Sequence, residues 1–230
     1  MKLDFQNHKS LVIALSGGID SYVCTYAALK QGIRVSGFHA ITARPVAKME
    51  RSSAKWLANS KNFYLEITDF RQMLETQVGY LSFEAIALDE LDTDREFGDG
   101  GGVSVTAFTT ILSCMIYYAH IAGKDGVVVG MTKEQASGRD AIGAFSDLES
   151  SINKLNPKAN SAPNILAPLR SLSKQEIIKL GFDLKVPFEK TWSCTSPQQT
   201  VRHCGKCAGC QARRNGFNAS GIDDPTDYHD

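Results

Sequence analysis

The sequence has no excess of charge and no long hydrophobic segment. Its 25 lysines and arginines balance 25 aspartates and glutamates, so the formal net charge at pH 7 is zero. This balance gives no electrostatic basis for a large nucleic-acid partner or a membrane surface. No run of about eighteen apolar residues occurs, and the N-terminal MKLDFQNHKS lacks the apolar stretch of a secretory signal. We therefore expect a cytoplasmic protein that requires neither a membrane nor a nucleic acid.

Cysteine is scarce, and four of the six cysteines fall within one short segment near the C-terminus. In a reducing compartment such clustering indicates a metal site rather than disulfides. Four thiolates at about 2.3 Å from an ion make a closed tetrahedral Zn²⁺ shell, which leaves no position for water. We predict a structural Zn²⁺ site, while an iron–sulfur cluster and redox-active or free thiols stay open as alternatives. The expected ligands are Cys194, Cys204, Cys207 and Cys210.

Other polar residues surround this cluster. His203 precedes Cys204 directly and is expected to be a surface or substrate-facing residue rather than a metal ligand. The same segment holds the one local basic patch of the chain, which is either a solvated face or a receptor for phosphates or a carboxylate. The patch consists of Arg202, Lys206, Arg213 and Arg214.

Short apolar segments alternate with amphipathic helical segments along most of the chain, as in βαβ units. This predicts an α/β fold with an open, doubly wound, parallel five-stranded sheet in residues 1–185, followed by a C-terminal zinc-binding segment, 186–230, packed on it. Strands are expected at 11–15, 34–39, 63–68, 127–130 and 164–167, and helices at 21–30, 45–58, 70–76, 104–122 and 140–155, with another from 173.

The segment 11–21, LVIALSGGIDS, places a glycine-rich loop between a strand and a helix. Gly17 and Gly18 have no Cβ, so phosphate oxygens can approach the backbone N–H groups. Ser16 and Ser21 add hydroxyl donors, and the helix N-terminus favours an anion. Asp20 either caps the helix or holds Mg²⁺. The loop matches neither the Walker A pattern nor the dinucleotide-binding pattern Gly-x-Gly-x-x-Gly. Its glycines, hydroxyl groups and helix N-terminus together predict pyrophosphate binding.

Three further segments carry polar candidates. Residues 132–140 follow the fourth strand and either line the cleft or form a solvated loop in which Asp140 caps the next helix. Ser173-x-x-Glu176 is a capping box. Lys174, in the first turn of that helix, opposes the macrodipole and indicates an anionic partner. Residues 84–102 are expected to form a loop that can close over the site. The polar candidates in the first of these segments are Lys133, Glu134, Arg139 and Asp140.

The six residues SGGIDS match the PP-loop of the ATP pyrophosphatases, which split ATP into AMP and pyrophosphate while adenylating a substrate. Further motifs are VVVGM, the Ala-Pro-Leu…Ser-Lys-Gln-Glu-Ile stretch at 167–177, Trp192-Ser-Cys194, and Cys204-Gly-x-Cys-x-x-Cys-x-x-Arg213. With these motifs in this order, the chain resembles the 7-cyano-7-deazaguanine synthase family of queuosine precursor biosynthesis.

The resemblance implies an adenine nucleotide alpha-hydrolase-like fold and an ATP-dependent carbon–nitrogen ligase, working as a homodimer. Such an enzyme adenylates 7-carboxy-7-deazaguanine and converts it with ammonia to 7-cyano-7-deazaguanine, using ATP, Mg²⁺ and Zn²⁺. The implied catalytic residues are Ser16, Asp20, Ser21 and Lys174. The implied nucleotide-binding residues are Leu15, Ser16, Gly17, Gly18, Ile19, Asp20, Ser21, His39 and Gly130.

Two segments depart from the family pattern. His39-Ala-Ile-Thr-Ala-Arg44 stands where members carry an Asp-Tyr-Gly-Gln-like stretch, and Val105-Thr-Ala-Phe108 stands where they carry Pro-Gly-Arg-Asn. The missing Arg removes a bidentate partner for phosphate or carboxylate. A divergent paralogue that joins a deazaguanine acid or another carboxylate to a different amine is therefore an alternative. Sulfur insertion into tRNA and a non-enzymatic nucleotide sensor are further alternatives, which the balanced charge and the intact loop respectively disfavour.

Overall fold

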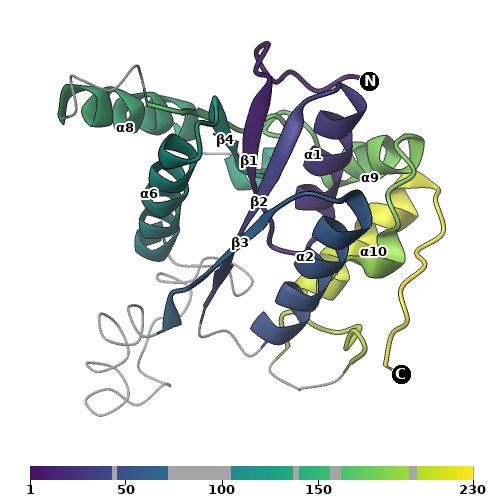
Figure 1. The fold of residues 1–230 in the computed structure, drawn as a ribbon. Coiled ribbons are helices and arrows are strands. Elements are labelled where there is room, and N and C mark those ends of the chain that lie inside the picture. The colour runs from purple at the N-terminus through teal and green to yellow at the C-terminus, as the bar shows by residue number, and fades with distance from the viewer. Residues whose placement is uncertain (43–45, 72–104, 137–139, 156–161, 197–200, 230) are drawn as a thin grey trace.

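The computed structural model describes residues 1–42, 46–71, 105–136, 140–155, 162–196 and 201–229. Its sheet consists of parallel strands in the order β3-β2-β1-β4-β5, which confirms the predicted architecture (Figure 1). The central strand β1 pairs Leu11 with Val35 on one side and with Gly126 on the other. The strands are β1 Ser10–Ala14, β2 Arg34–Ile41, β3 Leu65–Asp69, β4 Gly126–Val128 and β5 Asn164–Leu166.

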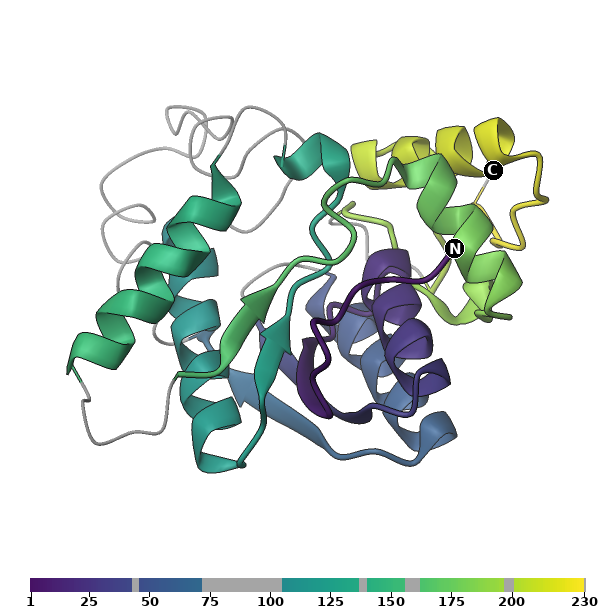
Figure 2. The same cartoon turned by 90° about the horizontal axis from the view of Figure 1, so that it is seen from above.

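Helices cover both faces of the sheet (Figures 1 and 2). α1, α2, α9 and α10 lie on one face, and α6 and α8 lie on the other. Successive strand side chains point to opposite faces, so Leu11 and Ile13 enter the core under α1, whereas Val12 enters the core under α6. The bounds are α1 Ile19–Lys30, α2 Ala47–Lys61, α6 Val105–Ile121, α7 Lys133–Ala136, α8 Ala141–Leu155, α9 Lys174–Asp183, the 3₁₀ helix η2 Phe188–Lys190, and α10 Ala208–Ser220.

The sheet order creates a switch point between β1 and β4. The chain leaves β1 toward β2 on one side and later returns to β4 on the other. Ligands of open α/β sheets bind at such a point, outside the carboxyl ends of the strands. The loop that follows β1 and the segment that follows β4 both lie there.

The helix ends show which polar residues act as caps. α1 begins at Ile19 with Gly18 as its N-cap, so the option that Asp20 caps this helix is wrong, because Asp20 lies inside the first turn. Asp140 caps α8, because its Oδ1 accepts a bond from the Gly143 N–H at 2.9 Å. The predicted capping box of Ser173 and Glu176 at α9 is confirmed.

Arg213 is buried, with 1% of its surface exposed, which corrects its place in the predicted basic patch. Its guanidinium donates to Thr191 Oγ1 at 2.7 Å, to the Phe188 carbonyl at 2.9 Å and to Asp224 Oδ1 at 3.1 Å. A buried charge needs such partners to offset its desolvation. Arg213 therefore joins α10 to the segment around η2 and does not face solvent or a phosphate.

Some predictions lie outside the described residues. They are Arg139, the loop at 84–102 and most of the helix expected at 70–76. Among the described helices, none is long and apolar enough to cross a membrane.

Candidate functional site

The PP-loop connects β1 to α1 at the switch point. Gly17 has φ +81°, a conformation that a residue with a Cβ rarely adopts, and the Gly18 N–H donates to Ser16 Oγ at 3.3 Å. Ser21 is buried, and its hydroxyl donates to the Gly18 carbonyl at 2.9 Å. The N-cap residue of α1 is Gly18, which has no side chain that could bond to the N–H groups of the first turn. The N–H groups of that turn thus remain suited to an anion.

The Gly17 carbonyl is held by two elements that are distant in the sequence. Ser53 Oγ of α2 lies 2.8 Å from this oxygen, and the Trp192 N–H donates to it at 2.8 Å. A Cβ on Gly17 would lie 2.5 Å from the Glu50 carbonyl oxygen, so only glycine fits under α2. Leu15 and Ile19, on either side of the loop, are buried in the core. The tertiary structure therefore fixes the loop from behind.

Asp20 and Lys174 form an ion pair beside the loop. Lys174 Nζ lies 2.6 Å from Asp20 Oδ1 and 2.8 Å from Oδ2, and about a quarter of each side chain is exposed. Lys174 stands at the start of α9, and α10 packs so closely behind it that a Cβ on Gly216 would meet Lys174 Cγ at 2.6 Å. The anionic partner expected for Lys174 is, in this structure, Asp20. The pair puts one carboxylate and one ammonium group at the edge of the loop.

The segment after β4 completes this side of the site. A Cβ on Gly130 would lie 3.2 Å from Asp20 Cβ, so the backbone of Gly130 packs directly against the first turn of α1. Lys133 and Glu134 begin the short helix α7, where both side chains are exposed. Burial raises the pKa of the Glu134 carboxylate, but other interactions lower it further, so the net shift is downward. The carboxylate accepts hydrogen bonds from its own N–H, from the Thr132 hydroxyl and from the Lys174 N–H, and the Lys174 charge attracts it.

His39 of β2 presents a buried acceptor. Its Nδ1 donates to the Leu15 carbonyl at 2.6 Å, and burial lowers its pKa, so the ring is neutral and Nε2 is a bare acceptor. Nε2 is buried and has no partner among the residues that the structure describes. An unpaired buried acceptor costs free energy, which a ligand N–H or O–H would recover. ATP fits this requirement, since its adenine amine and its ribose hydroxyls are such donors.

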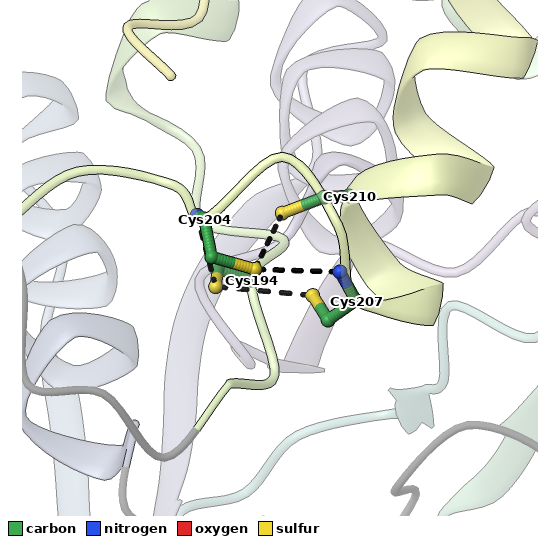
Figure 3. Close-up of side chains that lie close together, drawn as sticks. All are labelled: Cys194, Cys204, Cys207 and Cys210. Atoms are coloured by element: carbon green, nitrogen blue, oxygen red, sulfur yellow. Dashed lines mark hydrogen bonds between the residues drawn. The ribbon is translucent and has the colours of Figure 1, made fainter. Parts of the chain in front are cut away.

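The four cysteines near the C-terminus converge on one point (Figure 3). All four sulfur atoms lie within 4.8 Å of one another, with Cys204 and Cys210 at 4.0 Å and Cys194 and Cys207 at 3.8 Å. A tetrahedral ion with metal–sulfur bonds of about 2.3 Å places its ligands about 3.8 Å apart. Thiolates around a cluster of several irons must spread more widely. The spacing of the four cysteine sulfur atoms therefore fits a single metal ion.

Backbone N–H groups point at these sulfur atoms. Cys204 donates to Cys194 Sγ at 3.5 Å, Cys207 to Cys204 Sγ at 3.3 Å, and Thr195 to Cys207 Sγ at 3.3 Å. Burial disfavours the thiolate of Cys207, but bonds from the hydroxyl and the N–H of Thr195 lower its pKa to about 6. Metal ligands must be thiolates, and these donors stabilise that form.

A short segment links this metal centre to the PP-loop. Trp192 Nε1 donates to the Cys194 carbonyl at 2.9 Å, while the backbone N–H of the same residue holds Gly17. The indole also contacts the His203 ring, with the ring centroids 4.3 Å apart. His203 is 6% exposed, so of its two expected positions, at the surface or facing the substrate, the surface position is wrong. Burial lowers its pKa to about 4. It is not one of the converging metal ligands.

Sequence reasoning missed Ser53 and the burial of Arg213. Ser53 carries no local signal, because only the packing of α2 against the loop gives its hydroxyl a role. Arg213 stood within the cysteine motif, but its partner Asp224 could not be identified from spacing.

Comparison with known proteins gives consistent matches. The model of a family described as "Queuosine biosynthesis protein QueC" matches residues 10–221. The 7-cyano-7-deazaguanine synthase of Methanospirillum hungatei JF-1 is 30% identical over 220 residues, covering 94% of this chain and 98% of that protein. The enzyme of the same name from Methanothrix thermoacetophila is 31% identical over 229 residues, covering 94% and 97%.

Among solved structures, an NMN synthetase from Francisella tularensis is similar with a TM-score of 0.56 and 17% identity, covering 94% of this chain and 79% of that one. At this identity the similarity shows the fold alone, and it agrees with the parallel sheet described above.

Proposed function

The chain belongs to the family of the queuosine biosynthesis protein QueC, and on this premise we propose that it is an ATP-dependent ligase that makes 7-cyano-7-deazaguanine from 7-carboxy-7-deazaguanine and ammonia. The observation that carries the ATP chemistry is the PP-loop at the switch point, with the Asp20–Lys174 pair at its edge. We also propose that the enzyme is a homodimer and that it works in the cytoplasm, where thiols stay reduced.

In this mechanism the loop 16–21 binds the β- and γ-phosphates of ATP through its N–H groups and the start of α1. A carboxylate oxygen of the acid attacks the α-phosphorus, and pyrophosphate leaves. Ammonia then displaces AMP from the acyl adenylate to give the amide. The amide oxygen then attacks the α-phosphorus of a second ATP with release of pyrophosphate, and loss of AMP and a proton yields the nitrile. Positioning and charge stabilisation supply the catalysis, so no protein nucleophile is required.

The two members of the Asp20–Lys174 ion pair have different proposed roles. Asp20 would hold Mg²⁺, which would neutralise phosphate charge, and Lys174 would bind a phosphate oxygen; their ion pair supports these roles by putting both charged groups at the edge of the loop. His39 Nε2 accepts a hydrogen bond from the nucleoside part of ATP. The four cysteines would hold Zn²⁺, and its closed thiolate shell would stabilise the C-terminal segment.

A second candidate keeps adenylation and changes the acceptor. His39 is neutral and buried where family members carry an acidic residue, so the charge and the hydrogen-bonding pattern at the end of β2 differ. This favours a divergent paralogue that couples a deazaguanine acid, or another carboxylate, to an amine other than ammonia.

Product analysis separates the two candidates. The protein is incubated with ATP, Mg²⁺ and 7-carboxy-7-deazaguanine, with and without ammonium, and the products are identified by mass spectrometry. We expect AMP, pyrophosphate and the nitrile. Adenylate or amide without nitrile would favour the second candidate, and no acid-dependent AMP would reject both for this acid.

Ser53→Ala is expected to weaken pyrophosphate binding about fivefold, because the Gly17 carbonyl keeps only its Trp192 donor and the loop loses one hydrogen bond, worth roughly 0.5–1.5 kcal/mol. Isothermal titration calorimetry with pyrophosphate and Mg²⁺ measures the change. Ser52→Ala is the matched control, since among the residues that the structure describes the Ser52 hydroxyl bonds only to the Lys48 carbonyl of its own helix, at 2.9 Å. Equal affinities in the two variants would show that Ser53 does not position the loop.

A further inference from the structure

A cavity of about 260 Å³ lies between α2, the segment after η2 and the C-terminal tail. Its walls include Ser53, Trp56, Lys190, Trp192 and His203. Pockets for drug-sized ligands typically measure about 300–1,000 Å³. This cavity is smaller, so it suits a single ring system rather than a whole nucleotide.

Two indoles line the cavity, and they are the only tryptophans of the chain. Trp56 is 37% exposed, and it is stacked on Tyr22 with an interplanar angle of 6°, which fixes the plane of its indole. Trp192 is held by its bonds to Gly17 and Cys194 and by its contact with His203. Rigid aromatic walls favour a planar aromatic ligand.

His203 supplies a directed polar group. The Ser193 N–H donates to His203 Nε2 at 3.0 Å, so in the neutral ring the hydrogen is on Nδ1. The ring is 6% exposed and lines the cavity. Within the described part of the chain, none of the hydrogen bonds of His203 involves Nδ1. A ring acceptor in the cavity would satisfy this donor.

Charged groups of both signs complete the lining. Lys190 places its ammonium group 5.8 Å from the Trp56 ring centroid, and two carboxylates, Glu189 and Asp227, also line the cavity. An ammonium group suits a carboxylate ligand, and a carboxylate accepts bonds from ring N–H or amino groups. The lining thus complements a heteroaromatic acid that has both donors and acceptors.

We propose that this cavity binds the planar heteroaromatic ring of the acid substrate, an inference that rests on the proposed function. The ring packs against Trp56 and Trp192, and His203 Nδ1–H donates to a ring acceptor. The cavity adjoins the PP-loop, because its wall residues Ser53 and Trp192 both contact the Gly17 carbonyl. The ring is therefore held beside the PP-loop, on the side of the Gly17 carbonyl.

The test is a titration of the metal-loaded protein with 7-carboxy-7-deazaguanine in the absence of ATP. Tryptophan fluorescence reports directly on the cavity, and calorimetry gives the affinity. We expect saturable quenching and an affinity about tenfold lower in Trp56→Leu, the order of a lost base–aromatic contact. Phe182→Leu, at another exposed aromatic position, is the control and should bind like the unaltered protein.

Lys190→Met provides a second variant at an exposed position. It should weaken binding of the acid but not of 7-deazaguanine, which lacks the carboxylate, whereas Trp56→Leu should weaken both. Thermal melting verifies that each variant is folded. Absence of quenching, or equal affinities in Trp56→Leu and Phe182→Leu, would overturn the proposal.

The AMP assay on the same samples separates this proposal from the proposed function. If Trp56→Leu forms AMP with an unchanged KM for the acid, the cavity proposal is wrong and the ligase function stands. If the unaltered protein forms no acid-dependent AMP but still shows the quenching and its loss in Trp56→Leu, the ligase function fails and the cavity stands as a ring-binding site.

Discussion

Asp20→Asn is expected to abolish acid-dependent AMP formation, lowering the rate at least about 100-fold, the order lost when one preorganised charge-stabilising group is removed. The amide keeps the size of the carboxylate but removes the charge that we propose holds Mg²⁺ and that pairs with Lys174 at 2.6 Å. Because only about a quarter of each side chain is exposed, weakening the pair should lower the free energy of unfolding by about 1–3 kcal/mol. Release of pyrophosphate and AMP measures the rate, and thermal melting measures the stability.

A matched control for this variant is Asp183→Asn. Asp183 is an exposed carboxylate at the far end of α9, away from the loop, so its neutralisation should leave turnover unchanged. Lys174→Met should reduce turnover strongly as well, since it removes the cation from the same pair. Turnover of Asp20→Asn at the rate of the Asp183→Asn control would refute the role of Asp20.

Removal of the metal is expected to weaken ATP binding about tenfold and to lower the melting temperature by about 10 °C or more. Structural Zn²⁺ contributes several kcal/mol to folding, and each kcal/mol shifts the midpoint by about 2–4 °C in a protein of this size. The effect reaches ATP because Trp192 lies between the two sites, bonded to Gly17 and to Cys194. Without the metal this segment loses its anchor, and the loop loses a donor.

Cys204→Ser and chelator treatment test this coupling, with metal content, ATP affinity by calorimetry and thermal melting as readouts. Cys114→Ser is the control, because its thiol lies on α6 outside the metal cluster, and it should retain both metal and ATP binding. A metal-free protein that binds ATP as tightly as the loaded one would show that the cysteine centre stabilises only its own segment.

The features that the sequence predicted correctly are local ones. The apolar segment 11–15 and its counterparts have the length and composition of buried strands, and the capping box at Ser173 needs only three neighbouring residues. The cysteine spacing brings three ligands together within seven residues, so convergence there depends little on the rest of the fold. The helix after the loop begins at Ile19 rather than at Ser21, with Gly18 as its N-cap.

The sequence by itself determined the strands, the PP-loop and the metal-binding cysteines, because each depends on residues that are neighbours along the chain. Only the tertiary structure decided which side chains meet at the loop. Asp20 and Lys174 are 154 positions apart, and Ser53 and Trp192, which both contact the Gly17 carbonyl, lie far from it along the chain and far from each other. Such contacts follow from strand order and helix packing, which bury Arg213 and His203 as well. Periodicity shows that a residue is on a helix or strand, whereas its partner depends on how those elements pack.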